Sequence, residues 1–341
     1  MIGPQASLRQ SATRLVEDLQ ERICALVCDV EHSVAGRTNG RPAEFAVDAW
    51  ENDGASETVA GAGSTRVLSA GAAFEKGGVN TSVVTGTRLP PSVVSQRPEL
   101  AGDGFFATGV SVVLHPWNPY APTAHCNFRY FEAQAPDGRC SARWFGGGAD
   151  LTPFYPDIAD VRHFHATLRD ACDRHDPQFY PAFKAWCDRY FYLKHRRETR
   201  GVGGIFYDYL DADGFGESGQ RTNFEAPRSP EELLSFMADA GGAFAEAYLP
   251  LVERHGADAY GERERAFQLL RRGRYVEFNL VYDRGTHFGL QSGGRTESIL
   301  MSLPPLVRWA YDEQPEAGSA EGELAAFLRP RDWLSEVPAA S

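Results

Sequence analysis

The chain has 341 residues, of which 43% are hydrophobic, and its formal net charge is −12 at pH 7. A negative charge of this size argues against a nucleic-acid or anionic-membrane surface, because those partners require broad positive fields. A chain of this length can bury enough apolar surface to fold without disulfide bonds or a structural metal.

The six cysteines are scattered and include no C-x-x-C pair, which indicates reduced thiols. Residues 1–23 contain acidic side chains and no continuous apolar stretch, so we expect no signal peptide. No later stretch reaches the roughly 18 consecutive apolar residues of a membrane helix. We therefore expect a cytoplasmic protein without integral membrane association.

The predicted elements begin with an amphipathic helix from Leu8 to about residue 32, where apolar residues recur at three- and four-residue spacing. A strand is predicted over 43–52 and a flexible loop of small residues over 53–64. Between 67 and 134, β-type runs alternate with glycine and proline breaks. Consecutive strands joined in this way are expected to be antiparallel.

The second half of the chain is mostly helical in pattern. Helices are predicted over 157–174, 180–198, 230–254 and 261–272, and a last helical region begins at 296. Strands are predicted over 203–210 and 274–285. With no internal repeat or linker, we expect one domain over 1–341. The fold class is α+β, with a large, mostly antiparallel sheet flanked by helices on both faces.

The segment AHCNFRYFE carries a polar alternation. Side chains two apart on a strand point to one face, so His125, Asn127 and Arg129 are predicted to lie together. Ser111 and His115 share a face of the preceding strand by the same rule. This hairpin can present a functional site, and a solvated polar surface would give the same pattern.

The segment WFGGGADLTPFYP contains three glycines, which allow a ligand to approach the backbone closely. We expect Asp150 to end a tight turn here. Two interpretations stay open for it: the carboxylate caps the start of a helix, or it lies buried beneath a bound ring.

Arg200 and Arg295 lie in glycine-rich segments, RGVGGIFYD and LQSGGRTES, where a backbone can bend round an anion. Together with Arg129 they would suit a substrate that has several carboxylates. A lone surface arginine is the common alternative for each.

Four histidines could converge on a divalent metal, although their spacing matches no compact ligand motif. They are His115, His125, His165 and His195. The chain also lacks a G-x-S-x-G elbow, a P-loop and a dinucleotide-binding turn, which are the usual signals of serine hydrolases, nucleotide binding and nicotinamide chemistry.

Five segments together resemble the oxygen-dependent coproporphyrinogen oxidases, in the same order from about Phe45 to Trp333: FEKGGVN, HPWNPYAPTAHCNFR, WFGGGADLTPFY, RGVGGIFYD and LQSGGRTES. The resemblance implies oxidative decarboxylation of two propionates of coproporphyrinogen III to vinyl groups. The product would be protoporphyrinogen IX, with CO₂ and H₂O₂ released, in haem biosynthesis. It also implies O₂ as co-substrate, no organic cofactor, and a homodimer formed through residues 275–310.

The resemblance also assigns residues. It implies a proton donor at His125, and it implies substrate contacts at Ser111, Asn127, Phe128, Arg129, Gly293, Gly294 and Arg295. Some descriptions of the family place a metal at the four histidines named above. Our hypothesis for catalysis is that Asp150 orients a pyrrole N–H, while Arg129, Arg200 and Arg295 bind propionates. Two other functions stay open: a metal-dependent hydrolase built on the histidines, and a non-catalytic tetrapyrrole carrier.

Overall fold

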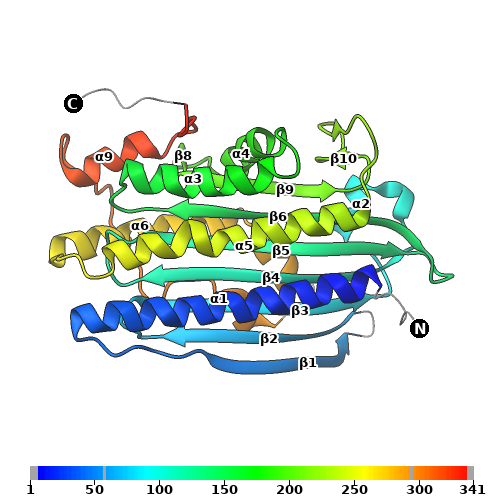
Figure 1. Ribbon diagram of the computed structural model, residues 1–341, viewed down its shortest axis with the longest axis horizontal. Helices are drawn as coiled ribbons and strands as arrows, with labels where there is room; N and C mark the ends of the chain where they lie inside the picture. The colour runs from blue at the N-terminus through cyan, green and yellow to red at the C-terminus, as the bar shows by residue number, and fades with distance from the viewer. Residues whose placement is uncertain (1–6, 57–58, 292–294, 336–341) are drawn as a thin grey trace.

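The computed structural model describes residues 7–56, 59–291 and 295–335. Its centre is a seven-stranded sheet in which every neighbouring pair is antiparallel. In spatial order the strands are β1 (Ala46–Ser56), β2 (Val59–Ser69), β3 (Phe74–Gly86), β4 (Gly104–Pro116), β5 (Thr123–Gln134), β6 (Cys140–Thr152) and β9 (Gly203–Leu210) (Figure 1). The predicted antiparallel sheet is confirmed.

The two faces of the sheet differ in character, as β5 illustrates. Phe128 and Tyr130 are completely buried, whereas Asn127 and Arg129 are half-buried. Burial of each large apolar side chain contributes about 1.5–3 kcal/mol, so this alternation fixes which face of β5 meets the core. The polar residues are left on the opposite face.

One helical layer covers the apolar face. It consists of α1 (Leu8–Thr38), α3 (Ile158–Asp173), α5 (Pro230–His255) and, beside them, α4 (Phe179–Tyr190). In Figure 1, α1, α3 and α5 lie in front of the sheet and run along its strands. The starts of α1, α3 and α5 are capped by the side chains of Ser7, Asp157 and Ser229, which accept backbone N–H bonds that the first helical turn leaves unpaired.

The opposite face carries α6 (Glu262–Val281), α7 (Arg284–Gln291) and α8 (Thr296–Leu300). Ser298 of α8 bonds Thr65 of β2 at 2.7 Å, and His115 of β4 bonds the carbonyl of Ser302 at 2.9 Å. Helices therefore lie on both faces, and the predicted α+β architecture is confirmed. No helix of the described residues is long and apolar enough to cross a bilayer.

The remaining elements are short. They are α2 (Pro91–Gln96), the 3₁₀ turn Pro98–Leu100, α9 (Ala320–Phe327), and two small sheets that pair β7 (Tyr192–Leu193) with β8 (Glu198–Thr199) and β10 (Gly214–Phe215) with β11 (Thr222–Asn223). The helix predicted over 180–198 is therefore wrong beyond Tyr190, where the chain turns into the β7–β8 hairpin. Conversely, α1 runs six residues beyond its expected end at 32.

The strand predicted over 274–285 is wrong, because α6 continues through this stretch to Val281. Its β-branched and aromatic residues favour a strand locally. However, Leu270, Tyr275 and Phe278 are buried at spacings that place them along one side of a helix. Packing of that side against β4, β9 and α9 decides the conformation.

Two predicted irregular segments are strands. Residues 53–64, predicted as a flexible loop, include the end of β1 and the start of β2. Gly63 opposes Trp50 there, and a Cβ on Gly63 would lie 2.5 Å from the Trp50 ring, so the glycine makes room for the aromatic side chain. The turn predicted at Asp150 is likewise absent, because β6 runs unbroken through Gly146–Gly148 to Thr152.

Candidate active site

A row of paired residues crosses the polar face of the sheet. From β3 to β6 it runs through Asn80, Ser111, Asn127 and Gly148. Residues paired across antiparallel strands project to the same face, so the predicted grouping of Ser111 with Asn127 follows from the register. Both are half-buried, which leaves them partly accessible on the α6 side.

His125 and Asp150 form the next pair of this face, because they oppose each other on β5 and β6. Nδ1 of His125 lies 2.9 Å from Oδ1 of Asp150. The Asp150 side chain is 2% exposed and that of His125 is 23% exposed. The imidazole therefore lies between the carboxylate and the accessible part of the site.

Arg200 reaches Asp150 from the segment that follows β8. Its Nε and Nη2 atoms donate to both carboxylate oxygens at 2.7–3.2 Å, and Nη1 donates to Oδ1 of Asn279 at 2.8 Å. The guanidinium also lies 4.1 Å from the ring centre of Phe191 and 4.6 Å from that of Tyr275. Only 2% of its side chain is exposed. This arrangement favours a role in holding Asp150 over the expected direct contact with a propionate.

The charge state of Asp150 follows from these neighbours. Burial alone would raise the pKa of its carboxyl group, but the Arg200 cation and the hydrogen bond from His125 outweigh burial and lower it. Asp150 is therefore an anion at neutral pH. The expectation that it caps a helix is wrong, since Asp157 provides the cap of α3.

The ionised carboxylate also determines which nitrogen of His125 carries the proton. A carboxylate only accepts hydrogen bonds, so Nδ1 of His125 carries the proton that it donates to Asp150. Among the described residues, Nε2 of His125 has no hydrogen-bond partner. This nitrogen is the atom of the pair that a ligand on the polar face could reach.

Arg129 lies two residues along β5 on the same face. Its Nη2 donates to Asp208 of β9 at 2.8 Å, and its Nη1 donates to Asn127 at 3.1 Å. One third of the side chain, 34%, is exposed, so Arg129 can still meet a ligand. Phe128 points the other way, into the core beneath α1 and α5, which leaves only its backbone near the site.

Arg295 is on the same side of the sheet but at its far edge. It forms an ion pair of 2.5 Å with Asp48 on β1. β1 and β5 are separated by four strand spacings, about 19 Å in all, so Arg295 and Arg129 could only meet one ligand if that ligand were broad. Gly293 and Gly294 lie outside the described residues.

The four histidines do not come together. His165 is buried in the α3 layer, where Tyr180 and the Val202 carbonyl occupy its two nitrogens. His195 is exposed and bonded to Tyr282 and Glu277.

His115 also has both of its nitrogens occupied, by Thr123 and the Ser302 carbonyl. With three of the four histidines already paired in separate places, the proposed ligand set does not fit a shared metal.

Several residues of the site were missed by the sequence analysis. Asp208 could have been found, because strand parity in GGIFYDYL places it on the face of Gly204 and Phe206. Asp283 and Arg284 could not, since they follow a helix that was predicted as a strand. Asp283 accepts from Tyr190 at 2.8 Å and from Thr286 at 2.7 Å.

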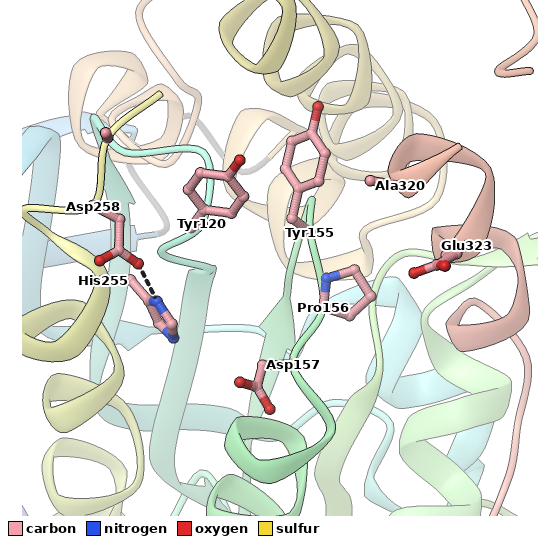
Figure 2. A pocket seen from close by; sticks show the side chains of 9 residues that line it. Tyr120, Tyr155, Pro156, Asp157, His255, Asp258, Ala320 and Glu323 are labelled. Carbon is pink, nitrogen blue, oxygen red and sulfur yellow. Dashed lines mark hydrogen bonds and ion pairs between the residues drawn. The ribbon is translucent and has the colours of Figure 1, made fainter. Parts of the chain in front are cut away.

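A separate pocket of about 520 Å³ lies at one end of the sheet and contains none of these residues. Figure 2 shows His255 and Asp258 on one side of this pocket and Glu323 on the other. His255, Asp157 and Asp160 are close enough to hold a metal ion. However, both nitrogens of His255 are bonded to carboxylates, of Asp160 and Asp258, so the ring has no free ligand atom.

Comparison with known proteins identifies the family of the chain. A model of the family described as coproporphyrinogen III oxidase matches residues 11–333. The chain is 52% identical to the oxygen-dependent coproporphyrinogen-III oxidase of Synechococcus sp. (strain CC9605), over 98% of this chain and 90% of the relative. It is 50% identical to the enzyme of the same name from Prochlorococcus marinus (strain MIT 9313), over 98% and 93%. The chain therefore belongs to the coproporphyrinogen III oxidase family.

Proposed function

We propose that this protein catalyses the oxygen-dependent oxidative decarboxylation of coproporphyrinogen III to protoporphyrinogen IX in haem biosynthesis. Each of two propionic acid side chains, R–CH₂–CH₂–COOH, reacts with O₂ to give R–CH=CH₂, CO₂ and H₂O₂. The O₂ requirement rests on the names of the relatives. The single observation that carries the proposal is the His125–Asp150–Arg200 chain beside Arg129 on the polar face of the sheet.

The proposed roles follow from accessibility. His125 exchanges a proton with the substrate or with reduced oxygen through Nε2, which is the accessible atom of the pair. Asp150 fixes the ring and its tautomer, and it stabilises the imidazolium when His125 is protonated. Arg200 keeps Asp150 ionised in a buried place. The earlier role of Asp150 as a direct partner of a pyrrole N–H gives way to this indirect one.

Substrate binding is assigned to the exposed polar groups. Arg129 binds one propionate and orients it, while Ser111 and Asn127 line the floor between β4 and β6. Arg295 is proposed to bind a second propionate at the β1 edge. This propionate would replace Asp48 as the ion-pair partner of Arg295. The four acid arms of a tetrapyrrole make it a ligand broad enough for both contacts.

We propose no organic cofactor and no metal in the reaction. Electrons pass from the reduced tetrapyrrole to O₂, so the overall reaction balances with the substrate as the reductant. The partners already bonded to His115, His165 and His195 argue against their joint use as ligands.

The decisive experiment is to incubate the purified protein with coproporphyrinogen III, with and without O₂. The proposal expects vinyl product, CO₂ and H₂O₂ in equal amounts, and only with O₂. A tetrapyrrole carrier would bind the compound without releasing CO₂. A metal-dependent hydrolase would act without O₂ and would lose activity in a chelator.

We further propose a cytoplasmic homodimer. All six cysteines are free, as expected in a reducing compartment. Large apolar side chains are exposed around the end of α6 and after α8, among them Val281, Leu306 and Trp309, at 53–56%. Clustered exposed apolar residues favour a protein interface, and a second copy of the chain is the proposed partner.

A further inference from the structure

Arg129 lies in a slot made by glycines. Its partners across the sheet are Gly109 on β4 and Gly146 on β6. A Cβ on Gly146 would lie 2.7–2.8 Å from three guanidinium atoms, and a Cβ on Gly109 would lie 3.0 Å from Cβ of Arg129. The glycines therefore let the guanidinium lie flat over β6, directed toward β9.

Asp208 meets the guanidinium at the far side of this slot. The pairing of β6 with β9 shifts between Gly147 and Phe145, and Asp208 lies within this shift. Its Oδ1 accepts the backbone N–H of Tyr209 at 3.0 Å, and Tyr209 has φ +50°, a conformation that non-glycine residues rarely adopt. The hydrogen bond from Tyr209 holds the carboxylate in place, and Oδ2 lies 2.8 Å from Arg129 Nη2.

Both arginines of this group lie next to carboxylates. Burial would lower the pKa of Arg129, but the Asp208 carboxylate outweighs burial and raises it. Arg284 lies near the same carboxylate, and its pKa is also raised, with Tyr190 and Asp208 acting against the effect of burial. Arg284 also forms an ion pair with Glu217, so the two arginines are balanced by two carboxylates, and Asp208 is the carboxylate that Arg129 contacts.

We infer that Asp208 is a positioning residue for substrate binding. It aligns the guanidinium of Arg129 across the Gly146 slot. The inference rests on the proposed role of Arg129 in binding a propionate. Because Asp208 already occupies one edge of the guanidinium, the substrate carboxylate binds through the donors that remain.

The test is a double-mutant cycle made of Asp208→Asn, Arg129→Ala and the variant that carries both substitutions. The measured quantities are KM and kcat for coproporphyrinogen III, and Kd for coproporphyrin III, the aromatic macrocycle with the same four propionates. Asp208→Asn keeps the shape and removes the charge, so KM and Kd should rise about tenfold, as for one weakened charge-assisted hydrogen bond, with a smaller change in kcat. The double variant should match Arg129→Ala.

Two further variants sharpen the cycle. Gly146→Ala should displace the flexible end of Arg129 and raise KM, and this effect should vanish in the Arg129→Ala background. Asp211→Asn is the control, because Asp211 lies just after β9 but pairs with Arg221 instead. It should leave KM unchanged.

The outcomes separate the two proposals. If Arg129→Ala raises KM but Asp208→Asn does not, the role of Asp208 fails alone. It also fails if the effects of the two substitutions multiply in the double variant. If Arg129→Ala leaves KM and Kd unchanged, the proposed propionate contact fails, and the role of Asp208 fails with it.

Discussion

Arg200 donates three hydrogen bonds to Asp150, at 2.7, 2.8 and 3.2 Å, and the side chain of each residue is only 2% exposed. Asp150 lies in β6, and Arg200 follows β8, 50 positions later in the sequence. A buried charge without a partner is strongly unfavourable, so each of these two side chains depends on the other.

Replacing Arg200 by Met should destabilise the fold by about 3–5 kcal/mol at neutral pH, because Asp150 is left as an unpaired buried anion. Urea unfolding would measure the loss. The double variant Arg200→Met with Asp150→Asn should recover part of it, since the buried charge is then absent. Equal destabilisation in the single and double variants would show that the pair is not coupled.

Replacing Asp150 by Asn should lower kcat by about a hundredfold or more, because the amide no longer stabilises the protonated His125. KM should change less, since Asp150 is too buried to meet substrate directly. Steady-state CO₂ release would measure both constants. Asp239→Asn is a suitable control, as Asp239 pairs with Arg174 and His175 outside the site. Near-normal turnover of the Asp150 variant would remove it from the mechanism.

Strand parity predicted part of this site. In AHCNFRYFE, alternation alone placed His125, Asn127 and Arg129 on one face, and the burial of Cys126 and Phe128 confirms it. The pattern is local, because a strand has a period of two whatever surrounds it. The same rule applied to β9 would have added Asp208.

The contacts of Arg200 could not be predicted from strand parity. Its partners Asp150 and Asn279 lie 50 and 79 residues away, and a glycine-rich flank indicates only that the chain bends. Gly146 was assigned to a turn for a similar reason. Glycine is common in turns. Within β6, the need for glycine at position 146 is explained by Arg129, which lies opposite it and would clash with a Cβ.

His255 should make the free energy of unfolding decrease as the pH rises above neutral. Its hydrogen bond to Asp160 comes first among the causes that raise its pKa to about 9, with Asp258 adding to it against the effect of burial. The unfolded value is about 6.5. The stabilisation is therefore complete below pH 6.5 and is lost as the pH rises through about 9.

The measurement is the free energy of unfolding of the wild type and of His255→Gln at several pH values. The wild type should be more stable by about 2 kcal/mol near pH 6, a value discounted for the exposed Asp258, and the difference should shrink by pH 10. Asp258→Asn should reduce it only in part, because Asp160 remains. A difference that does not change between pH 6 and pH 10 would contradict the assignment.

The proposed dimer should dissociate when charge is placed on its exposed apolar surface. Val281→Glu and Leu306→Glu each put a carboxylate where the partner would bury an apolar side chain, and an unpaired buried charge is costly. Sedimentation equilibrium of the wild type should give twice the chain mass, and the double variant should give the mass of one chain. Val47→Glu is the matched control, since Val47 is 63% exposed on β1, outside residues 275–310. A monomeric wild type, or a Val47 variant that dissociates equally, would place the interface elsewhere.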